Sequence, residues 1–295
     1  MSTTGAGQAG GGGGGSRADG RVTTRDFLRM KERGERIAVL TCYDHLFARL
    51  LDTTALDAVL VGDSLGEVSL GYRSTLPVTL EEMIHHASAV RRGLEGPLLI
   101  VDLPFLSFQV SPEDAVRSAG RVLKETGAEA VKLEGGNERT VEAARRMVEA
   151  GIPVMGHLGL TPQSVHQFGG YGLRGRDPDE AEVTLERARA LDDAGCFSLV
   201  LEMIPSELAG RITGEVSAAT IGIGAGPGVD GQVLVLPDML GLNRGFEPRF
   251  LRKFAELGEE ATRAVGEYVE AVKGGDYPSA DESYSGEPRD RGGSG

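Results

Sequence analysis

Ala58-Val59-Leu60-Val61-Gly62-Asp63 is a short apolar run that stops at a carboxylate. Two later runs have the same form, Leu98-Leu99-Ile100-Val101-Asp102 and Ala130-Val131-Lys132-Leu133-Glu134. A run that is apolar on both faces, without period-2 alternation, is typical of a parallel strand covered by helices. A carboxylate at the end of a buried strand is costly to desolvate unless it meets a cation or a hydrogen-bond donor. The three ends therefore predict one shared site, and hard oxygen ligands favour Mg²⁺ or a similar divalent ion.

Eight runs of this kind alternate with amphipathic segments along the chain. The predicted strands are Ile37 to Cys42, Ala58 to Asp63, Leu98 to Asp102, Ala130 to Leu133, Pro153 to His157, Phe197 to Glu202, Thr220 to Ala225 and Gln232 to Leu236. Eight β/α alternations within about 250 residues predict a single-domain α/β fold, the (β/α)₈ TIM barrel. A doubly wound open sheet is the alternative.

The segments between the strands carry helix signals at both ends. Cap residues precede Pro or acids at Thr79, Ser111 and Asp177, which predicts helix starts there. Four glycines just past periodic segments are predicted to be left-handed helix ends: Gly93, Gly127, Gly151 and Gly195. A last pattern, Phe250 to Val272, predicts a long C-terminal helix.

Composition separates the barrel from two polar tails. Gly10 to Gly15 is an unbroken glycine run, and residues 1–21 lack the apolar surface needed for a core. Asp, Ser, Gly and Arg predominate again near the other end. We therefore expect disordered tails at residues 1–21 and 274–295 around one catalytic barrel domain at residues 22–273.

Charge and cysteine usage narrow the classes of function. The net charge of -13 argues against nucleic acid as a partner, because nucleic-acid binding requires a basic patch. Cys42 and Cys196 are too few for a disulfide framework. No apolar stretch approaches the roughly 20 residues of a membrane helix, and no secretory signal is recognisable. The sequence predicts a cytoplasmic enzyme that acts on small molecules.

Strand ends are the first candidates for catalytic residues, because the active site of such a barrel forms at the C-terminal face of its strands. These ends offer Asp44, Asp63, Ser64, Asp102, Lys132, Glu134, His157 and Glu202. A single strand-end acid is often only a turn residue. Several acids converging with a lysine favour a functional site.

Lys132 and His157 each allow more than one interpretation. Lys132 lies two residues before Glu134, so both side chains point to the same side of their strand. Lys132 either pairs with the carboxylates or holds an anionic substrate group, and the neighbouring acids disfavour a Schiff-base role because they favour the charged ammonium. His157 is a proton carrier, a substrate donor or a structural histidine.

The stretch from Ile221 to Gly228 has glycine spacing similar to that of a phosphate-binding loop. The helix and the ribose-binding acid that should follow such a loop are missing. We therefore predict close backbone packing there.

Six motifs, in this order, closely resemble the ketopantoate hydroxymethyltransferase family over residues 22 to 272. They are Val61-Gly62-Asp63-Ser64-Leu65-Gly66, Ser74-Thr75-Leu76-Pro77-Val78-Thr79, Val101-Asp102-Leu103-Pro104-Phe105, Val131-Lys132-Leu133-Glu134-Gly135-Gly136, Gly156-His157-Leu158-Gly159-Leu160-Thr161-Pro162-Gln163 and Asp230-Gly231-Gln232-Val233-Leu234-Val235. Six motifs in one order are far more specific than any single one.

The resemblance implies an enzyme of pantothenate biosynthesis, on the pathway to coenzyme A. It would move a one-carbon unit from 5,10-methylenetetrahydrofolate to 3-methyl-2-oxobutanoate by Mg²⁺-dependent enolate chemistry and yield 2-dehydropantoate. The resemblance places Asp63, Asp102 and Glu134 at the Mg²⁺ site, and it also implies a homo-oligomer, typically a decamer.

The resemblance also implies how the remaining residues are used. Ser64 and Lys132 match positions that hold the oxo acid. Asp63 and Asp102, which belong to the metal site, also match positions that bind this substrate. Glu202 matches the general acid/base and His157 a histidine of the substrate site.

Two other readings compete. A Mg²⁺-dependent lyase of the phosphoenolpyruvate mutase/isocitrate lyase type would share the barrel and the α-keto acid, but its Lys-Lys-Cys-Gly-His loop motif is absent. A non-catalytic binding barrel would not need the full set of candidate residues: Asp63, Asp102, Lys132, Glu134 and Glu202.

Overall fold

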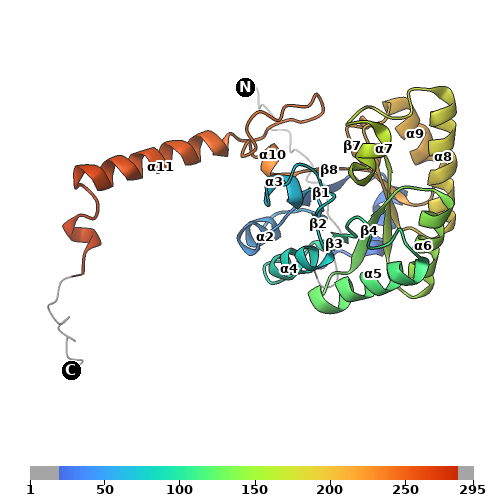
Figure 1. Cartoon of the computed structure of the whole chain (residues 1–295), viewed down its shortest axis with the longest axis horizontal. Helices are drawn as coiled ribbons and strands as arrows, with labels where there is room; N and C mark the ends of the chain where they lie inside the picture. The colour runs from blue at the N-terminus through green and yellow to red at the C-terminus, as the bar shows by residue number, and fades with distance from the viewer. Residues whose placement is uncertain (1–19, 285–295) are drawn as a thin grey trace, which may run out of the picture. The chain divides into compact units, whose positions relative to one another are not determined.

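A closed barrel of eight parallel strands forms the centre of the protein, which is described by a computed structural model covering residues 20–284 (Figure 1). The strands are β1 (Ile37–Thr41), β2 (Ala58–Val61), β3 (Leu98–Asp102), β4 (Ala130–Glu134), β5 (Val154–Gly159), β6 (Ser198–Glu202), β7 (Ala219–Ile223) and β8 (Gly231–Leu234). Each strand pairs with its neighbour in the chain, and β8 pairs with β1. The predicted (β/α)₈ barrel is confirmed, and the open sheet is excluded by this closure. The eight predicted strands agree with the observed ones within two residues at each end.

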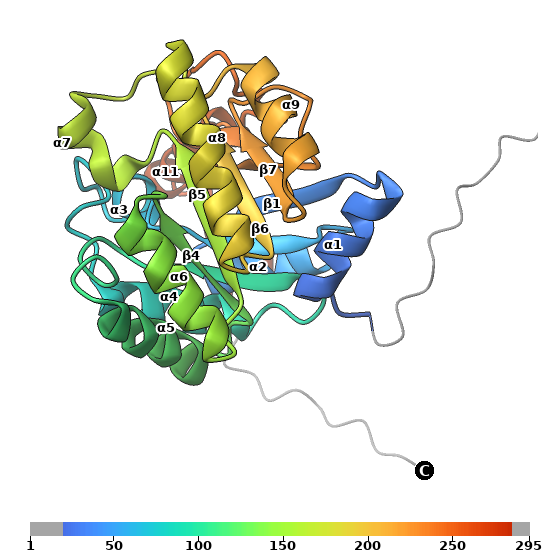
Figure 2. The same cartoon turned by 90° about the vertical axis from the view of Figure 1, so that its right-hand side faces the viewer.

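The helices that connect the strands surround the barrel, and Figure 2 shows α6 and α8 in front of β4, β5 and β6. The α-helices are α1 (Thr24–Arg33), α2 (His45–Asp52), α3 (Leu65–Val68), α4 (Leu80–Arg91), α5 (Pro112–Thr126), α6 (Glu138–Glu149), α7 (Val165–Phe168), α8 (Pro178–Asp193), α9 (Ser206–Glu215), α10 (Leu236–Met239) and α11 (Leu257–Gly274). Two 3₁₀ turns, η1 (Pro162–Ser164) and η2 (Ala280–Glu282), complete the described elements.

The predicted helix caps are present at three helix starts. The side chains of Thr79, Ser111 and Asp177 accept hydrogen bonds from backbone N–H groups in the first turns of α4, α5 and α8. Such a cap satisfies a donor that the helix itself leaves unpaired.

Three of the four predicted glycine helix ends have a left-handed backbone. The φ angles are 74° at Gly127, 84° at Gly151 and 91° at Gly195. Gly93 does not adopt this conformation, so that prediction is wrong. A Cβ at Gly93 would lie 2.7 Å from the carbonyl oxygen of His45, so this glycine serves the close approach of α2.

The barrel interior is apolar toward the N-terminal ends of the strands. Alternate strand residues, such as Leu98 and Ile100 of β3, join one buried cluster. Helix α1 contributes Phe27, whose ring meets that of Phe197 edge-on at 5.5 Å. Because side chains alternate along a strand, the next inward position of β3 is Asp102. The interior thus changes from apolar to ionisable toward the C-terminal ends of the strands.

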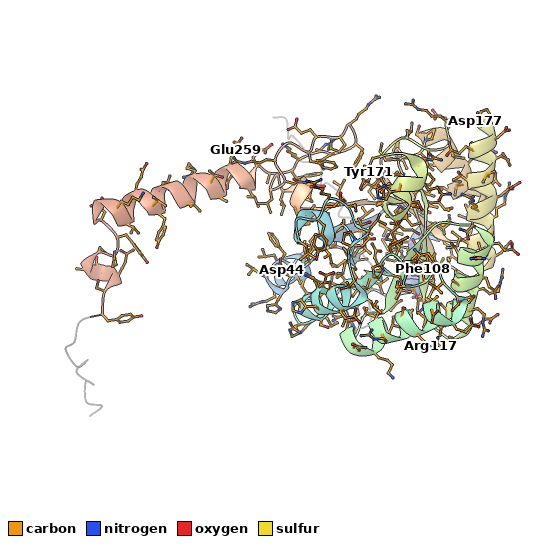
Figure 3. The ribbon with its side chains drawn as sticks, viewed as in Figure 1. Asp44, Phe108, Arg117, Tyr171, Asp177 and Glu259 are labelled. Carbon is orange, nitrogen blue, oxygen red and sulfur yellow. The ribbon has the colours of Figure 1, made fainter. Side chains whose placement is uncertain are left out.

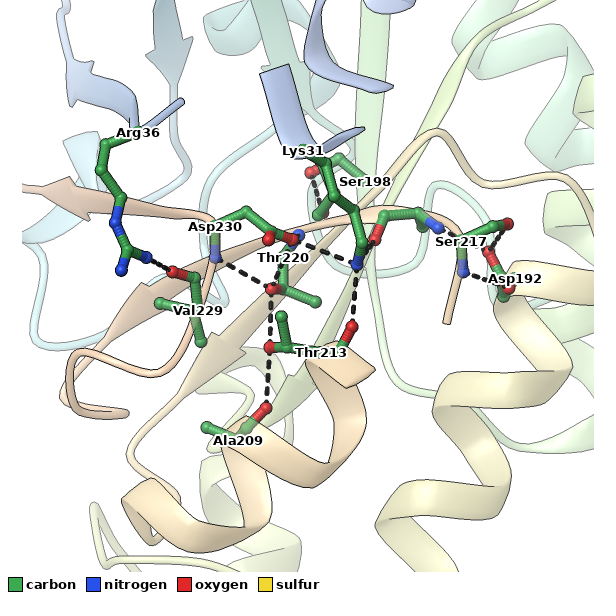
Figure 4. A network of polar contacts seen from close by, with 12 residues as sticks. Lys31, Arg36, Asp192, Ser198, Ala209, Thr213, Ser217, Thr220, Val229 and Asp230 are labelled. Carbon is green, nitrogen blue, oxygen red and sulfur yellow. Dashed lines mark hydrogen bonds and ion pairs between the residues drawn. The ribbon is translucent and has the colours of Figure 1, made fainter. Parts of the chain in front are cut away.

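A separate polar network fixes α1 to the N-terminal side of β7 (Figure 4). The Lys31 ammonium lies 3.2 Å from the Asp230 carboxylate and donates to the carbonyls of Thr213 and Ala218, both at 2.9 Å. Asp230 in turn accepts from the hydroxyl and the backbone N–H of Thr220. The Lys31–Asp230 pair therefore lies at the N-terminal ends of the strands, whereas Asp102 lies at a C-terminal end.

The loop from Ile221 to Gly228 packs closely, as its sequence predicts. A Cβ at Gly226 would lie 2.4 Å from that of Ser206, and a Cβ at Gly228 would lie 3.5 Å from the Cα of Gly210. Its glycines therefore allow the backbone to approach α9.

The described residues fall into two compact units, 20–235 and 236–284, and all eight strands lie in the first. The predicted barrel boundary at residue 273 lies beyond this division. The predicted helix start at Phe250 is wrong, because α11 begins at Leu257. Backbone N–H groups at and before this start bond to other parts of the second unit: Phe254 donates to the carbonyl of Met239, and Leu257 donates to that of Leu240.

The predicted tails lie mostly outside the described residues, which exclude 1–19 and 285–295. Part of the C-terminal tail is described, and there η2 forms, with the backbone N–H of Ser279 donating to Glu282 Oε2 at 2.9 Å.

Candidate active site

The ends of β3, β4 and β5 bring two acids, a lysine and a histidine together inside the barrel. Asp102 is the register partner of Lys132, and Glu134 is the register partner of His157. All four side chains are at least 93% buried. The parity of the strands therefore places Lys132 and Glu134 on the same inner side, as expected from their spacing.

Lys132 lies at the centre of this group. Its Nζ is 3.0 Å from Asp102 Oδ1 and 3.1 Å from His157 Nδ1. Burial lowers the pKa of Lys132, but the charges of Asp102, Glu134 and Asp63 outweigh burial and raise it above its usual value. Lys132 is thus a charged ammonium, which disfavours a Schiff base.

His157 joins two carboxylates. Its Nε2 lies 3.1 Å from Glu202 Oε2, and its Nδ1 lies 3.4 Å from Glu134 Oε1. Burial and the Lys132 ammonium lower the pKa of His157, but hydrogen bonds to Glu134 and Glu202 prevail and raise it to about 9. The Glu202 side chain is 19% exposed, so it reaches the open side of the group.

Asp63 approaches from the loop after β2. Its backbone N–H donates to Asp102 Oδ2 at 3.1 Å. Burial, followed by the charges of Glu134 and Asp102, raises the pKa of the Asp63 carboxyl well above its usual value. Burial also raises the pKa of Asp102, although Lys132 opposes this. Carboxylates gathered in a buried place with too few cations have the electrostatics of a cation site.

Two other candidates lie nearby but differ in role. Ser64 follows Asp63, and its hydroxyl is 2.8 Å from the Tyr43 hydroxyl, so it belongs to the same mouth of the barrel. Asp44 caps α2 by accepting from the N–H of Phe47 at 2.9 Å. Figure 3 labels Asp44 beside that helix, and this cap gives it a structural use.

Most of the chain matches one family of enzymes. The family model described as ketopantoate hydroxymethyltransferase matches residues 21–280. A protein of Chlorobaculum parvum named 3-methyl-2-oxobutanoate hydroxymethyltransferase is 54% identical, over 89% of this chain and 96% of its own length. A protein of the same name from Flavobacterium johnsoniae is 52% identical, over 90% and 97%. The chain belongs to the ketopantoate hydroxymethyltransferase family.

Solved structures of other enzymes share the fold of this ketopantoate hydroxymethyltransferase family member. Phosphonopyruvate hydrolase in complex with oxalate and Mg²⁺ has a TM-score of 0.58 at 11% identity, over 88% of this chain and 93% of that one. A 2,3-dimethylmalate lyase, described as a PEP mutase/isocitrate lyase superfamily member, has a TM-score of 0.54 at 18% identity, over 89% and 92%. At such identities the likeness establishes the barrel alone. The lyase alternative therefore shares the architecture, while the closely similar sequences carry the hydroxymethyltransferase name.

The residues of this family member fit a divalent cation. Among residues 20–284, no three His, Cys, Asp or Glu side chains form a ready-made metal cluster. Mg²⁺ does not require one, because it is usually bound by one or two carboxylates together with water and substrate oxygens. Asp102 Oδ1 is buried and, although it is 3.0 Å from Lys132 Nζ, it accepts no hydrogen bond of good geometry.

The charge of the group points the same way. Asp63, Asp102 and Glu134 are all buried around the single ammonium of Lys132, and burial and their mutual repulsion raise the pKa values of Asp63 and Asp102. A divalent ion would supply the positive charge that this group lacks.

Three residues at the mouth were given no role by the sequence. Tyr43 contacts Ser64, and Gln163 donates to the Asp63 carboxylate at 2.8 Å. Tyr171, labelled beside α7 in Figure 3, donates to Glu67 at 3.4 Å. Burial and Glu67 raise the pKa of Tyr171 to about 12, with smaller contributions from Glu202 and Asp63. The sequence gives one sign that Tyr43 belongs to the site: it is a polar residue two positions after the end of β1.

Gly159 determines where Glu202 lies, and its replacement is expected to damage the site. Gly159 has φ 93°, and an added Cβ would lie 2.1 Å from the carbonyl oxygen of Glu202. We expect Gly159→Ala to lower the free energy of unfolding by about 3 kcal/mol, through strain at positive φ and overpacking. The measurement is urea denaturation together with the specific activity.

Gly151→Ala is the matched control. Gly151 has φ 84°, close to that of Gly159, but nothing lies within 4 Å of its added Cβ. We expect a cost of about 1 kcal/mol and unchanged activity. Equal losses in both variants would show that the contact with Glu202 is unimportant.

Proposed function

We propose that this protein transfers a hydroxymethyl group from 5,10-methylenetetrahydrofolate to 3-methyl-2-oxobutanoate and forms 2-dehydropantoate. The observation that carries the proposal is the buried group of Asp63, Asp102, Lys132 and Glu134 at the mouth of a barrel. Such a group suits a small anionic oxo acid together with a divalent ion. The names of the closely similar relatives support the same reaction.

Asp63, Asp102 and Glu134 are the residues proposed to hold Mg²⁺. When bound, the ion would act as a Lewis acid on the oxygens of the oxo acid and make its C3 proton more acidic. Asp63 and Asp102 supply neighbouring carboxylates, joined through the Asp63 N–H. Glu134 is held from its other side by His157.

Lys132 and Ser64 are the residues proposed to bind the carboxylate of the substrate. The Lys132 ammonium is a compact charge, and its ion pair with Asp102 at 3.0 Å holds it at the end of β3. The Ser64 hydroxyl is oriented by Tyr43. Together they would fix which end of the oxo acid points into the barrel.

Glu202 is proposed to take the C3 proton, with His157 as its positioning partner. His157 Nε2 lies 3.1 Å from Glu202 Oε2, so the imidazole fixes the direction of the carboxyl group that would act as the base. The C3 carbon then forms a bond to the methylene carbon of the donor, and both carbon–nitrogen bonds of that methylene group break. One water per turnover supplies the new hydroxyl group, and its other proton and the C3 proton end on the two nitrogens of the donor.

The deciding experiment is a turnover assay of the purified full chain with both substrates. We expect 2-dehydropantoate to form with Mg²⁺, to stop when a chelator removes the metal and to resume when Mg²⁺ is restored. Absence of product under all metal conditions would refute the proposed reaction. Cleavage of 2,3-dimethylmalate in place of transfer would favour the lyase alternative.

We also propose a homo-oligomer in the cytoplasm. The two cysteines, Cys42 and Cys196, are buried and unpaired, which agrees with a reducing compartment. Light scattering of the full chain would give the number of subunits. No helix within residues 20–284 has the length and apolarity required to cross a bilayer.

A further inference from the structure

Gln163 uses its backbone N–H and both ends of its side-chain amide on the residues around the acid cluster. It lies in η1, in the loop after β5, and is 6% exposed. Its backbone N–H donates to Glu134 Oε2 at 2.9 Å, and its Nε2 donates to Asp63 Oδ2 at 2.8 Å. Nε2 also donates to the Leu103 carbonyl at 3.0 Å, while Oε1 accepts from Gln109 Nε2 at 2.9 Å. One residue therefore ties together the segments that follow β2, β3 and β4.

The partners fix the direction of the Gln163 amide. The Leu103 carbonyl can only accept a hydrogen bond, and so can ionised Asp63, so both must face the NH₂ end. The oxygen end then meets the NH₂ group of Gln109. A carboxylate at this position would place an oxygen against two acceptors, and a hydrophobic side chain would leave both without their donor.

The chemistry of an amide suits the position between two acids. Asp63 and Glu134 repel each other in a buried place, and burial and that repulsion both disfavour the ionised form of Asp63. A lysine here would neutralise the acids and compete with a cation, whereas an amide donates hydrogen bonds without adding charge. The bonds from Gln163 thus orient both carboxyl groups without adding a positive charge of their own.

We infer that Gln163 is a positioning residue that holds Asp63 and Glu134 in place for a divalent cation and the oxo acid. The inference rests on the proposed function, because it takes these two acids as part of the metal site. Groups that orient metal ligands typically contribute 10- to 100-fold in metal affinity or activity. Gln109 only completes the oxygen end of the amide, so its contribution should be smaller.

The test compares Gln163→Met and Gln163→Asn with the control Gln109→Met. Met has similar length without a donor, and Asn keeps the amide but is too short, so loss of folding in one variant leaves the other to be measured. Mg²⁺ binding is measured by calorimetry with 3-methyl-2-oxobutanoate present and no folate, which separates affinity from turnover. We expect the Kd for Mg²⁺ to rise about 10- to 100-fold in both Gln163 variants and less than about threefold in the control.

A comparison of kinetic constants completes the test. In the turnover assay, the Mg²⁺ concentration for half-maximal rate should rise in the Gln163 variants, while the KM for the folate stays unchanged. An unchanged Kd for Mg²⁺ in a folded Gln163 variant, or an equal rise in Gln109→Met, overturns the inference and leaves the proposed function intact. A wild-type protein that turns over without binding Mg²⁺ overturns the metal site and the role of Gln163 together.

Discussion

Asp102→Asn is expected to slow exchange of the C3 proton of 3-methyl-2-oxobutanoate by roughly 10³-fold. The substitution keeps the shape of the side chain but removes a buried carboxylate that lies 3.0 Å from Lys132 Nζ and accepts from the Asp63 N–H. A Lewis acid is worth several kcal/mol of transition-state charge stabilisation, and 1.36 kcal/mol corresponds to a factor of ten. Proton NMR in deuterated water measures the exchange with Mg²⁺ and without folate, so that only the first chemical step is followed.

Asp57→Asn is the matched control for this prediction. Asp57 is also buried, and its carboxylate accepts from the Ala38 N–H at 2.9 Å, but it precedes β2 at the other end of the strand. We expect exchange in this variant to stay within about twofold of wild type, because the site charges are untouched. Equal exchange rates in Asp102→Asn and wild type would remove Asp102 from the metal site.

The barrel was predictable because strand burial leaves a direct trace in the sequence. A strand covered by helices on one side and packed in the lumen on the other must be apolar on both faces, as in Leu98 to Val101. The same periodicity places Lys132 and Glu134 on one side. The predicted gathering of strand-end acids followed from topology alone, since parallel strands of one barrel all end at the same rim.

The missed features depend on contacts between residues distant in sequence. Nothing in the pattern around Gln163 indicates that its amide meets Asp63, a hundred residues earlier. Gly93 has the position of a helix cap, but its lack of a Cβ serves the approach of His45. The start of α11 was placed too early because Phe254 donates to the last residue of α10 and Leu257 to the residue after it, an alternative that helix periodicity does not reveal.

Lys132→Met is expected to lower the free energy of unfolding by about 3 kcal/mol and to reduce turnover below detection. Breaking a buried ion pair by removing one partner typically costs about 3 to 5 kcal/mol, because the remaining charge is left without compensation. Here the ammonium is the buried cation nearest to Asp102, at 3.0 Å. Urea denaturation in the presence of a chelator measures the loss without interference from bound metal.

The sign of the pH dependence separates this explanation from simple loss of packing. The pKa values of Asp63 and Asp102 are already raised in the folded protein, and removing Lys132 raises them further. A group whose pKa is higher in the folded state favours folding at low pH and loses that contribution as pH rises. The deficit of Lys132→Met should therefore be smaller at about pH 5.5 than at about pH 8. A deficit independent of pH would mean that cavity formation, not charge, determines the loss.

Lys31→Met provides the control for lysine removal in general. Lys31 is also largely buried and pairs with Asp230 at 3.2 Å, but its network lies at α1 and the N-terminal side of β7 (Figure 4). We expect this variant to lose stability while its kcat/KM at a temperature where it remains folded stays within about threefold of wild type. Both lysines thus contribute to folding through a buried ion pair, but only Lys132 faces the carboxylates that are proposed to hold the metal, so only its removal should abolish turnover in folded protein.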